Sequence, residues 1–302
     1  MRPVPLRAAA MLGVIVSFCG ARASDLYVTD DGDASIKVFD QFSGNYLGRW
    51  GVGFLQDPTG IVMDNHNNLY VADYAKGEIL RFNAFNGAYE GQFGGGFLDQ
   101  PLGLAVDSNG VVYAANAGGS DVIRFDGATG DYMGTLAQGF AQRPFGLALD
   151  ANNELYVTDS ASGNVFRFNA ANGAYGGTLG GGMMAFPYGI SIDPNGVADI
   201  FDGGNNQILR FNSTSGAYMG NLAGGFARIG RGLACDQNGV EYLADYGGGV
   251  VDRFNNETGA YMGQIGSGIL MDPIFVTPAP EPLPLAFLCA GVVALIVRRR
   301  QH

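Results

Sequence analysis

Apolar positions along this chain fall in short runs that are rich in β-branched and aromatic residues and are separated by turn residues. Each run predicts a β-strand. In one representative stretch the runs occupy residues 101–107, 111–116, 121–126 and 131–136. The intervening D-x-N-G at 107–110 and D-G-A-T-G at 126–130 supply Asp to cap a turn and Gly where φ must be positive. The stretch therefore predicts a unit of four antiparallel strands.

This unit recurs six times at a constant spacing of 43 residues, without an insertion. One aligned position holds Tyr27, Tyr70, Tyr113, Tyr156, Asp199 and Tyr242. Others hold Phe39, Phe82, Phe125, Phe168, Phe211 and Phe254, and Gly44, Gly87, Gly130, Gly173, Gly216 and Gly259. Four strands in each repeat of this length are typical of a propeller blade. We therefore predict an all-β fold, a six-bladed β-propeller of four-stranded antiparallel blades over residues 24–277.

The first and last strands of the propeller are predicted to share a blade. The chain enters on a second strand at 26–30 and ends on a first strand at 272–276, so pairing between them closes the ring and removes free sheet edges. An open solenoid, or a longer ring made by two chains, leaves this split blade unexplained.

The two ends of the chain predict export. In residues 1–23, Arg2 and Arg7 precede an apolar run at 8–18, and the small-x-small motif Ala21-Arg22-Ala23 follows it. This order is typical of a signal peptide that is cleaved after Ala23. A lipoprotein signal at Cys19 is the alternative, but Phe18 stands where that processing needs a small residue.

The tail at 278–302 contains an apolar stretch, 283–297, that predicts a transmembrane helix. At about 22 Å the helix is shorter than the roughly 30 Å hydrocarbon core, so a buried helix of a soluble domain is the alternative. The basic residues that follow are expected to be cytoplasmic: Arg298, Arg299 and Arg300.

The net charge limits which partners the protein can bind, and the cysteine content limits how its fold can be stabilised. Residues 24–277 keep 11 of the 17 basic and 27 of the 28 acidic residues, a net charge near −16. This charge argues against nucleic acid or an anionic membrane surface as a partner. Cys235 is the one cysteine of this body, so packing must stabilise it without an internal disulfide.

The repeat resembles the NHL family, whose pattern runs P-x-G-[LI]-A-x-D, L-Y-V-A-D, V-x-R-F-D and G-x-Y-x-G. The resemblance covers residues 24–277 and implies the propeller fold. The tail resembles the PEP-CTERM sorting signal, since Pro280, Glu281 and Pro282 precede the apolar span and Arg298 to Arg300 follow it. That resemblance implies recognition by an exosortase, cleavage, and delivery to the cell surface or extracellular matrix. An ordinary single-pass anchor after a Pro-rich linker is the alternative.

The sequence offers few groups for catalysis. Propellers of the NHL and lactonase-like families hold a metal in the central channel, but the innermost strands carry no carboxylate before their terminal Asp. His66 is the one histidine of the body and lies in a predicted turn. The repeated Arg and Asp residues, such as Arg81 and Asp73, are interpreted as structural pairs and turn caps. We expect no enzyme activity and no cofactor; the alternative is an extracellular metal-dependent lyase or lactonase-like hydrolase.

The loops on one face of the ring differ between blades and predict an acidic and a basic sector. The acidic sector comprises Asp31, Asp33, Asp57, Asp99 and Asp272, and the basic sector Arg143, Arg228 and Arg231. The aspartates are candidate ligands for a cation such as Ca²⁺ or for a partner, although a solvated acidic surface is the simpler explanation. The expected function is a noncatalytic surface or matrix module that binds a protein or an exopolysaccharide.

Overall fold

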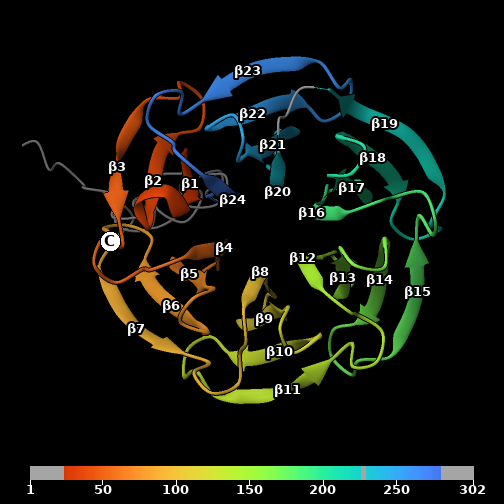
Figure 1. Ribbon diagram of the computed structural model, residues 1–302, viewed down its shortest axis with the longest axis horizontal. Helices are drawn as coiled ribbons and strands as arrows, with labels where there is room; N and C mark the ends of the chain where they lie inside the picture. The colour runs from red at the N-terminus through yellow and green to blue at the C-terminus, as the bar shows by residue number, and fades with distance from the viewer. Residues whose placement is uncertain (1–23, 226–228, 280–302) are drawn as a thin grey trace, which may run out of the picture.

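The propeller prediction is confirmed. The computed structural model describes residues 24–225 and 229–279, which form six four-stranded sheets arranged around a common axis (Figure 1). Within each sheet the neighbouring strands are antiparallel. In five sheets the strands follow chain order, with the first strand nearest the axis, and in the sixth the inner strand is the last strand of the chain. The strands expected over residues 101–136 occur as β8 to β11, with bounds that agree within one residue.

The blades are named by their strands. The first three consist of β4 (Pro58–Met63), β5 (Asn68–Asp73), β6 (Glu78–Asn83) and β7 (Tyr89–Phe93); of β8 (Pro101–Val106), β9 (Val111–Asn116), β10 (Asp121–Asp126) and β11 (Tyr132–Leu136); and of β12 (Pro144–Leu149), β13 (Glu154–Asp159), β14 (Asn164–Asn169) and β15 (Tyr175–Leu179). The next two consist of β16 (Pro187–Ile192), β17 (Val197–Asp202), β18 (Gln207–Asn212) and β19 (Tyr218–Gly224); and of β20 (Gly230–Cys235), β21 (Val240–Asp245), β22 (Val250–Asn255) and β23 (Tyr261–Ile265).

The remaining blade, here the closing blade, joins both ends of the described chain. It consists of β24 (Pro273–Pro278), β1 (Asp25–Asp30), β2 (Ser35–Asp40) and β3 (Tyr46–Trp50), with the short 3-10 helix η1 (Asp31–Asp33) after β1. β24 pairs antiparallel with β1, placing Val276 opposite Val28 and Pro273 opposite Asp30. The predicted ring closure is therefore confirmed, and no blade of the described chain lacks its inner strand.

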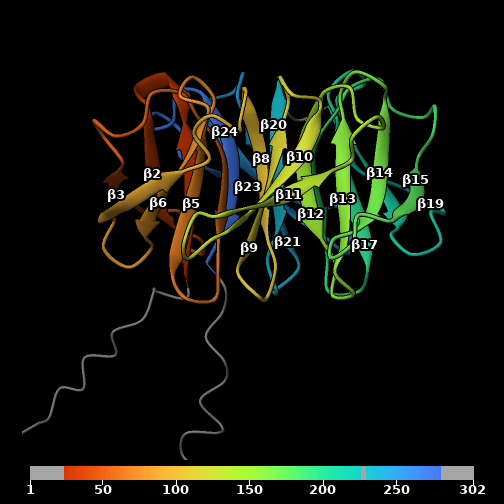
Figure 2. The ribbon, with the colours of Figure 1, turned by 90° about the horizontal axis from the view of Figure 1, so that it is seen from below.

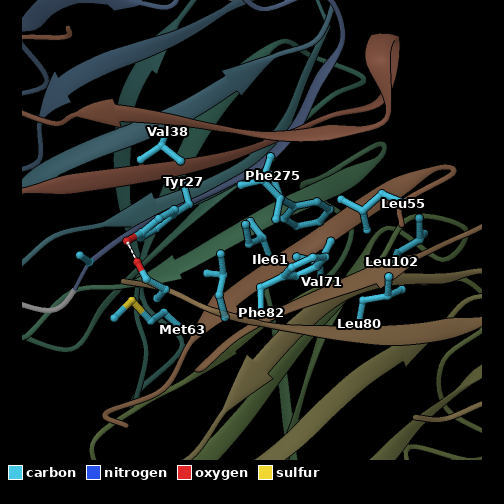
Figure 3. Packing of buried hydrophobic residues seen from close by; sticks show 14 of the residues in the cluster. Tyr27, Val38, Leu55, Ile61, Met63, Val71, Leu80, Phe82, Leu102 and Phe275 are labelled. Carbon is cyan, nitrogen blue, oxygen red and sulfur yellow. Dashed lines mark hydrogen bonds between the residues drawn. The ribbon is translucent and has the colours of Figure 1, made fainter. Parts of the chain in front are cut away.

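The inner strands approach one another so closely that five of them carry glycine at the same position. A Cβ atom at Gly60, Gly103, Gly146, Gly189 or Gly232 would lie 2.2–2.7 Å from an atom of the next inner strand, a distance that real Cβ contacts do not reach. The sixth inner strand has Phe275 at this position. Its ring lies 5.7 Å from that of Phe145 and packs with Ile61 and Leu102 (Figure 3). The five glycines allow the inner strands to approach closely, which narrows the channel at this level. The side chain of Phe275 fills the space that remains there.

Among the repeated polar residues, a tyrosine and an arginine join one blade to the next, whereas the aspartate caps the entry loop of its own blade, as the sequence predicted for it. The hydroxyl of Tyr27 donates a 2.7 Å hydrogen bond to the carbonyl of Ala84 in the next blade (Figure 3). Arg81 donates to the carbonyls of Gly127 and Ala128 in the same way. Asp73 accepts backbone N–H groups from the loop that enters its own blade. At these copies the side chains satisfy backbone groups that would otherwise lack a partner.

The ring has two distinct faces. The entry face carries the loops that lead into the inner strands and those that join second to third strands, such as 94–100 and 74–77. The hairpin face carries the turns between first and second and between third and fourth strands, and it is the lower side in Figure 2. Ser24 and Ala279 lie together on the hairpin face, since Ala279 N donates to Asp25 O and Gln41 N to Ser24 O.

The predicted signal peptide at 1–23 and the sorting residues Pro280 to Pro282 and Arg298 to Arg300 lie outside the described residues. The predicted transmembrane segment at 283–297 lies outside them too. Within the described ranges, no helix has the length and apolar character needed to cross a membrane.

Truncation of the channel residue should destabilise the whole ring. We expect Phe275→Ala to lower the free energy of unfolding by about 3–5 kcal/mol, since it leaves a cavity that the surrounding strands cannot fill. Urea denaturation followed by fluorescence measures the change, and Phe42→Ala, at a side chain 61% exposed, is the matched control. A loss no larger than that of the control would contradict the role of Phe275 in the core.

Candidate functional site

Three of the five predicted acidic residues meet on the entry face. Asp31 lies in η1, Asp57 precedes β4 and Asp272 precedes β24. The backbone N–H of Asp31 donates to the carbonyl of Asp272 at 3.1 Å, and the carboxyl groups of Asp31 and Asp57 share a hydrogen bond. Burial raises the pKa of Asp57 to about 6, and the charge of Asp31 adds to the effect. Burial also raises the pKa of Asp31. Burial and mutual repulsion therefore make these two carboxyl groups harder to ionise than ordinary aspartates.

The other two acidic residues do not join this group. Although burial opposes ionisation of Asp33, hydrogen bonds from Lys37 and Ser35 hold its pKa below the usual value. Arg49 lies 3.2 Å from the same carboxylate. Asp99 is exposed and lies beside Gly118. The expected acidic sector is therefore a three-residue cluster, a neutralised Asp33 and a solvated Asp99.

No group of three or more His, Cys, Asp or Glu side chains in residues 24–225 and 229–279 is arranged to hold a metal ion. His66 lies in the turn before β5 with 75% of its side chain exposed, as a solvated turn residue does. The turn aspartates, such as Asp107, accept hydrogen bonds from their own turns. A Ca²⁺ site stays an expectation of the sequence.

The central channel is lined by apolar side chains below Phe275. A cavity of about 240 Å³ opens there between the inner strands, and it is bordered by Ile61, Leu104, Leu147, Ile190, Leu233 and Val276. Ser191, Cys235 and Thr277 add the polar side chains of this lining. The carboxylate-free inner strands expected from the sequence therefore give a largely apolar channel.

A buried polar network lies between the last two blades, where the sequence breaks its own repeat. Asp199 stands at the position of the repeated tyrosine, and Glu241 stands where other copies have Leu, Val or Ala. Asn256 Nδ2 donates to Asp199 at 2.8 Å and to Glu241 at 3.0 Å. Ser191 donates to Glu241 at 2.6 Å, and Arg210 Nε donates to Asp199 at 2.9 Å. Each carboxylate thus has partners from neighbouring strands.

The electrostatics of this network favour one charged carboxylate. Burial raises the pKa of Glu241 to about 8, and repulsion from Asp199 adds to it. Burial raises the pKa of Asp199 to about 6, while Arg210 and Asn256 oppose the rise. At neutral pH the network therefore holds a protonated Glu241 beside an Asp199–Arg210 ion pair. Glu241 has no exposed surface, so its role is structural.

The basic residues of the entry face differ in environment. Arg143 is exposed, and Arg228 lies outside the described residues. Arg231, on β20, is half-buried, and its guanidinium carbon lies 5.0 Å from the ring centre of Tyr188 and 5.4 Å from that of Tyr246. The loop sequences predicted that Arg231 belongs to the basic sector, but they did not predict its aromatic surroundings. The available signal was that Arg231 occupies the same strand position as Phe145 and Tyr188.

Glu241 should make the stability of the protein fall as pH rises. The unfolded chain releases this proton near the ordinary pKa of 4.5 and the folded chain at about 8, so the free energy of unfolding decreases across that interval. Between about pH 5 and about pH 8 we expect a loss of more than about 1 kcal/mol, much of it absent in Glu241→Gln. Urea denaturation across this range tests the effect, with exposed Asp99→Asn as control. An unchanged pH dependence in Glu241→Gln would show that Glu241 ionises in the folded state.

Comparisons with known proteins agree on the fold. No protein-family model and no curated protein sequence matches the chain. Among solved structures, a chain of the crystal structure of a nidogen/laminin complex superposes with a TM-score of 0.74 at 15% sequence identity. The match covers 86% of this chain and 99% of that chain. Similarity at this level of identity shows that the chain adopts a β-propeller fold.

Proposed function

We propose that the protein is an exported, noncatalytic binding module that presents its entry face to a partner outside the cell. The observation that carries this proposal is the composition of that face. Phe186, Ile229 and Met271 are 52%, 48% and 58% exposed there, in the loops before three consecutive inner strands. Tyrosine, phenylalanine, methionine and arginine are enriched at protein interfaces, and Tyr188 and Arg231 lie on the same side of the channel.

The geometry of the chain ends supports this orientation. Ala279 lies on the hairpin face, so the predicted sorting tail at 278–302 leaves the propeller on the side opposite the entry face. A propeller held by such a tail directs its entry face away from the membrane. The similar propeller belongs to a structure described as a nidogen/laminin complex, which favours a protein over a small molecule as the class of partner.

The proposed localisation follows from the resemblance of the tail to the PEP-CTERM signal. We expect an exosortase-type enzyme to recognise Pro280, Glu281 and Pro282 and to release the propeller to the cell surface or extracellular matrix. Mass spectrometry of the protein from native cells and their matrix tests this. The expected C-terminal peptide from the matrix ends near Pro280 to Pro282. A chain that retains Arg298 to His302 and stays in the membrane would show a permanent anchor instead.

Binding through the entry face is tested by capture of matrix proteins on the immobilised full chain, purified in detergent. We expect Phe186→Ser together with Met271→Ser to abolish most capture, because both changes remove exposed apolar contacts from this face. Phe85→Ser is the matched control, since Phe85 is 46% exposed in the turn between β6 and β7 on the hairpin face. Equal capture by the entry-face variant and the control would contradict the proposal.

A further inference from the structure

We propose that the aromatic-flanked guanidinium of Arg231 is a docking site for an acidic side chain of a partner protein, a site here named the Arg231 pocket. The pocket consists of Arg231, Phe145, Tyr188 and Tyr246 and lies at the entry-face mouth of the channel. This inference rests on the proposed function, because it specifies which chemistry the entry face recognises. It concerns a different part of that face from the acidic cluster of Asp31, Asp57 and Asp272.

The guanidinium of Arg231 is held by rings rather than by hydrogen bonds. Its central carbon lies 5.0 Å from the ring centre of Tyr188, 5.4 Å from that of Tyr246 and 6.0 Å from that of Phe145. Phe145 and Tyr188 contact each other with ring centres 4.6 Å apart. These ring contacts stabilise the cation, but they supply no acceptors for its N–H groups.

Arg231 differs in this respect from the repeated arginines of the third strands. Arg81, Arg124, Arg167 and Arg253 each donate to backbone carbonyls of the following blade, and Arg210 pairs with Asp199. Within residues 24–225 and 229–279, Arg231 forms no ion pair and no hydrogen bond. Its Nε is buried without a partner, as is the Nε of Arg81, Arg124, Arg167 and Arg253, so Arg231 differs from them in its terminal N–H groups. Its donors are therefore unused by the fold.

A carboxylate is the ligand that this arrangement fits. A guanidinium offers parallel N–H donors that match the two oxygens of a carboxylate, and the flanking rings lower local water access and strengthen the pair. Asp31, Asp57 and Asp272 belong to the next two inner strands beyond β20 in the ring, whereas Arg231 contacts the rings of the two preceding ones, β16 and β12. The acidic cluster therefore belongs to blades other than those whose rings flank Arg231.

The surroundings favour a protein over an acidic polysaccharide. Phe186 and Ile229 lie before β16 and β20, the strands that carry Tyr188 and Arg231, and Met271 lies before the next inner strand, β24. These exposed side chains offer apolar contacts that a protein segment can cover. The net negative charge of the propeller would repel a polyanionic polysaccharide. A single acidic side chain among apolar residues would instead pair with Arg231 alone. The expected partner segment is therefore an Asp or Glu flanked by apolar residues.

A phage-displayed library of random peptides, selected on the immobilised full chain, tests the pocket directly. We expect the enriched peptides to share an Asp or Glu flanked by apolar residues. Changing that acid to its amide in a synthetic peptide should weaken binding by about tenfold or more, as should Arg231→Gln in the protein. Arg231→Lys should restore only part of the affinity, because an ammonium cannot form the parallel pair. Arg143→Gln, an exposed arginine on the same face, should leave binding unchanged.

The outcomes separate this pocket from the broader function. Peptides without a shared acid, or acidic peptides equally bound by Arg231→Gln and wild type, would overturn the pocket. Tighter binding of a glucuronate oligosaccharide than of any selected peptide would overturn the proposal that the partner is a protein. If matrix capture still depends on Phe186 and Met271 in either case, the entry face remains the binding surface. Should Arg231→Gln fail to fold, the acid-to-amide exchange in the peptide still decides the question on the wild-type protein.

Discussion

The close approach of the inner strands around the axis is the constraint on which the rest of this structure depends. At Gly60, Gly103, Gly146, Gly189 and Gly232 the next strand lies where a Cβ atom would stand, so these positions fix how tightly the blades gather. The sixth position holds Phe275, which occupies the space along the axis and joins the core clusters of several blades. Because neighbouring blades lie so close together, the side chains of Tyr27 and Arg81 reach backbone carbonyls of the next blade and donate hydrogen bonds to them. The ring is thereby a single packed body rather than six independent sheets.

Polar and charged side chains with unusual surroundings occur where single residues depart from the 43-residue repeat. Asp199 and Glu241 replace a tyrosine and an apolar residue of the repeat, and Asn256 and Arg210 supply the hydrogen bonds that the lost tyrosine hydroxyl would have made. Since one of the two carboxylates keeps its proton, this interior bears no uncompensated charge at neutral pH. Arg231 is a second departure, but it lies at the mouth of the channel, where its guanidinium contacts aromatic rings and forms no hydrogen bond within the described residues. A symmetric scaffold thus gains one internal and one external asymmetric site.

The two faces divide the work of the module. The hairpin face receives both ends of the described chain and is occupied by turns whose aspartates cap their own backbone. The entry face carries the loops that vary most, and there exposed apolar side chains, two partly buried carboxyl groups and the Arg231 pocket lie around one channel mouth. Under the proposed function, the tail attaches on one side and the variable residues bind on the other.

The sequence by itself determined the fold, because a 43-residue period with four strand-like runs and turn glycines in each copy fixes blade number, strand order and the closing pair of strands. It also predicted that His66 is a solvated turn residue and that Arg81 and Asp73 are structural, since repeated residues meet repeated surroundings. Only the tertiary structure decided which of the five aspartates meet, because that depends on loop conformation and on competition from Lys37 and Arg49 for Asp33. It likewise decided the protonation of Glu241 and the environment of Arg231. Both follow from side chains that belong to different blades and that no local pattern brings together.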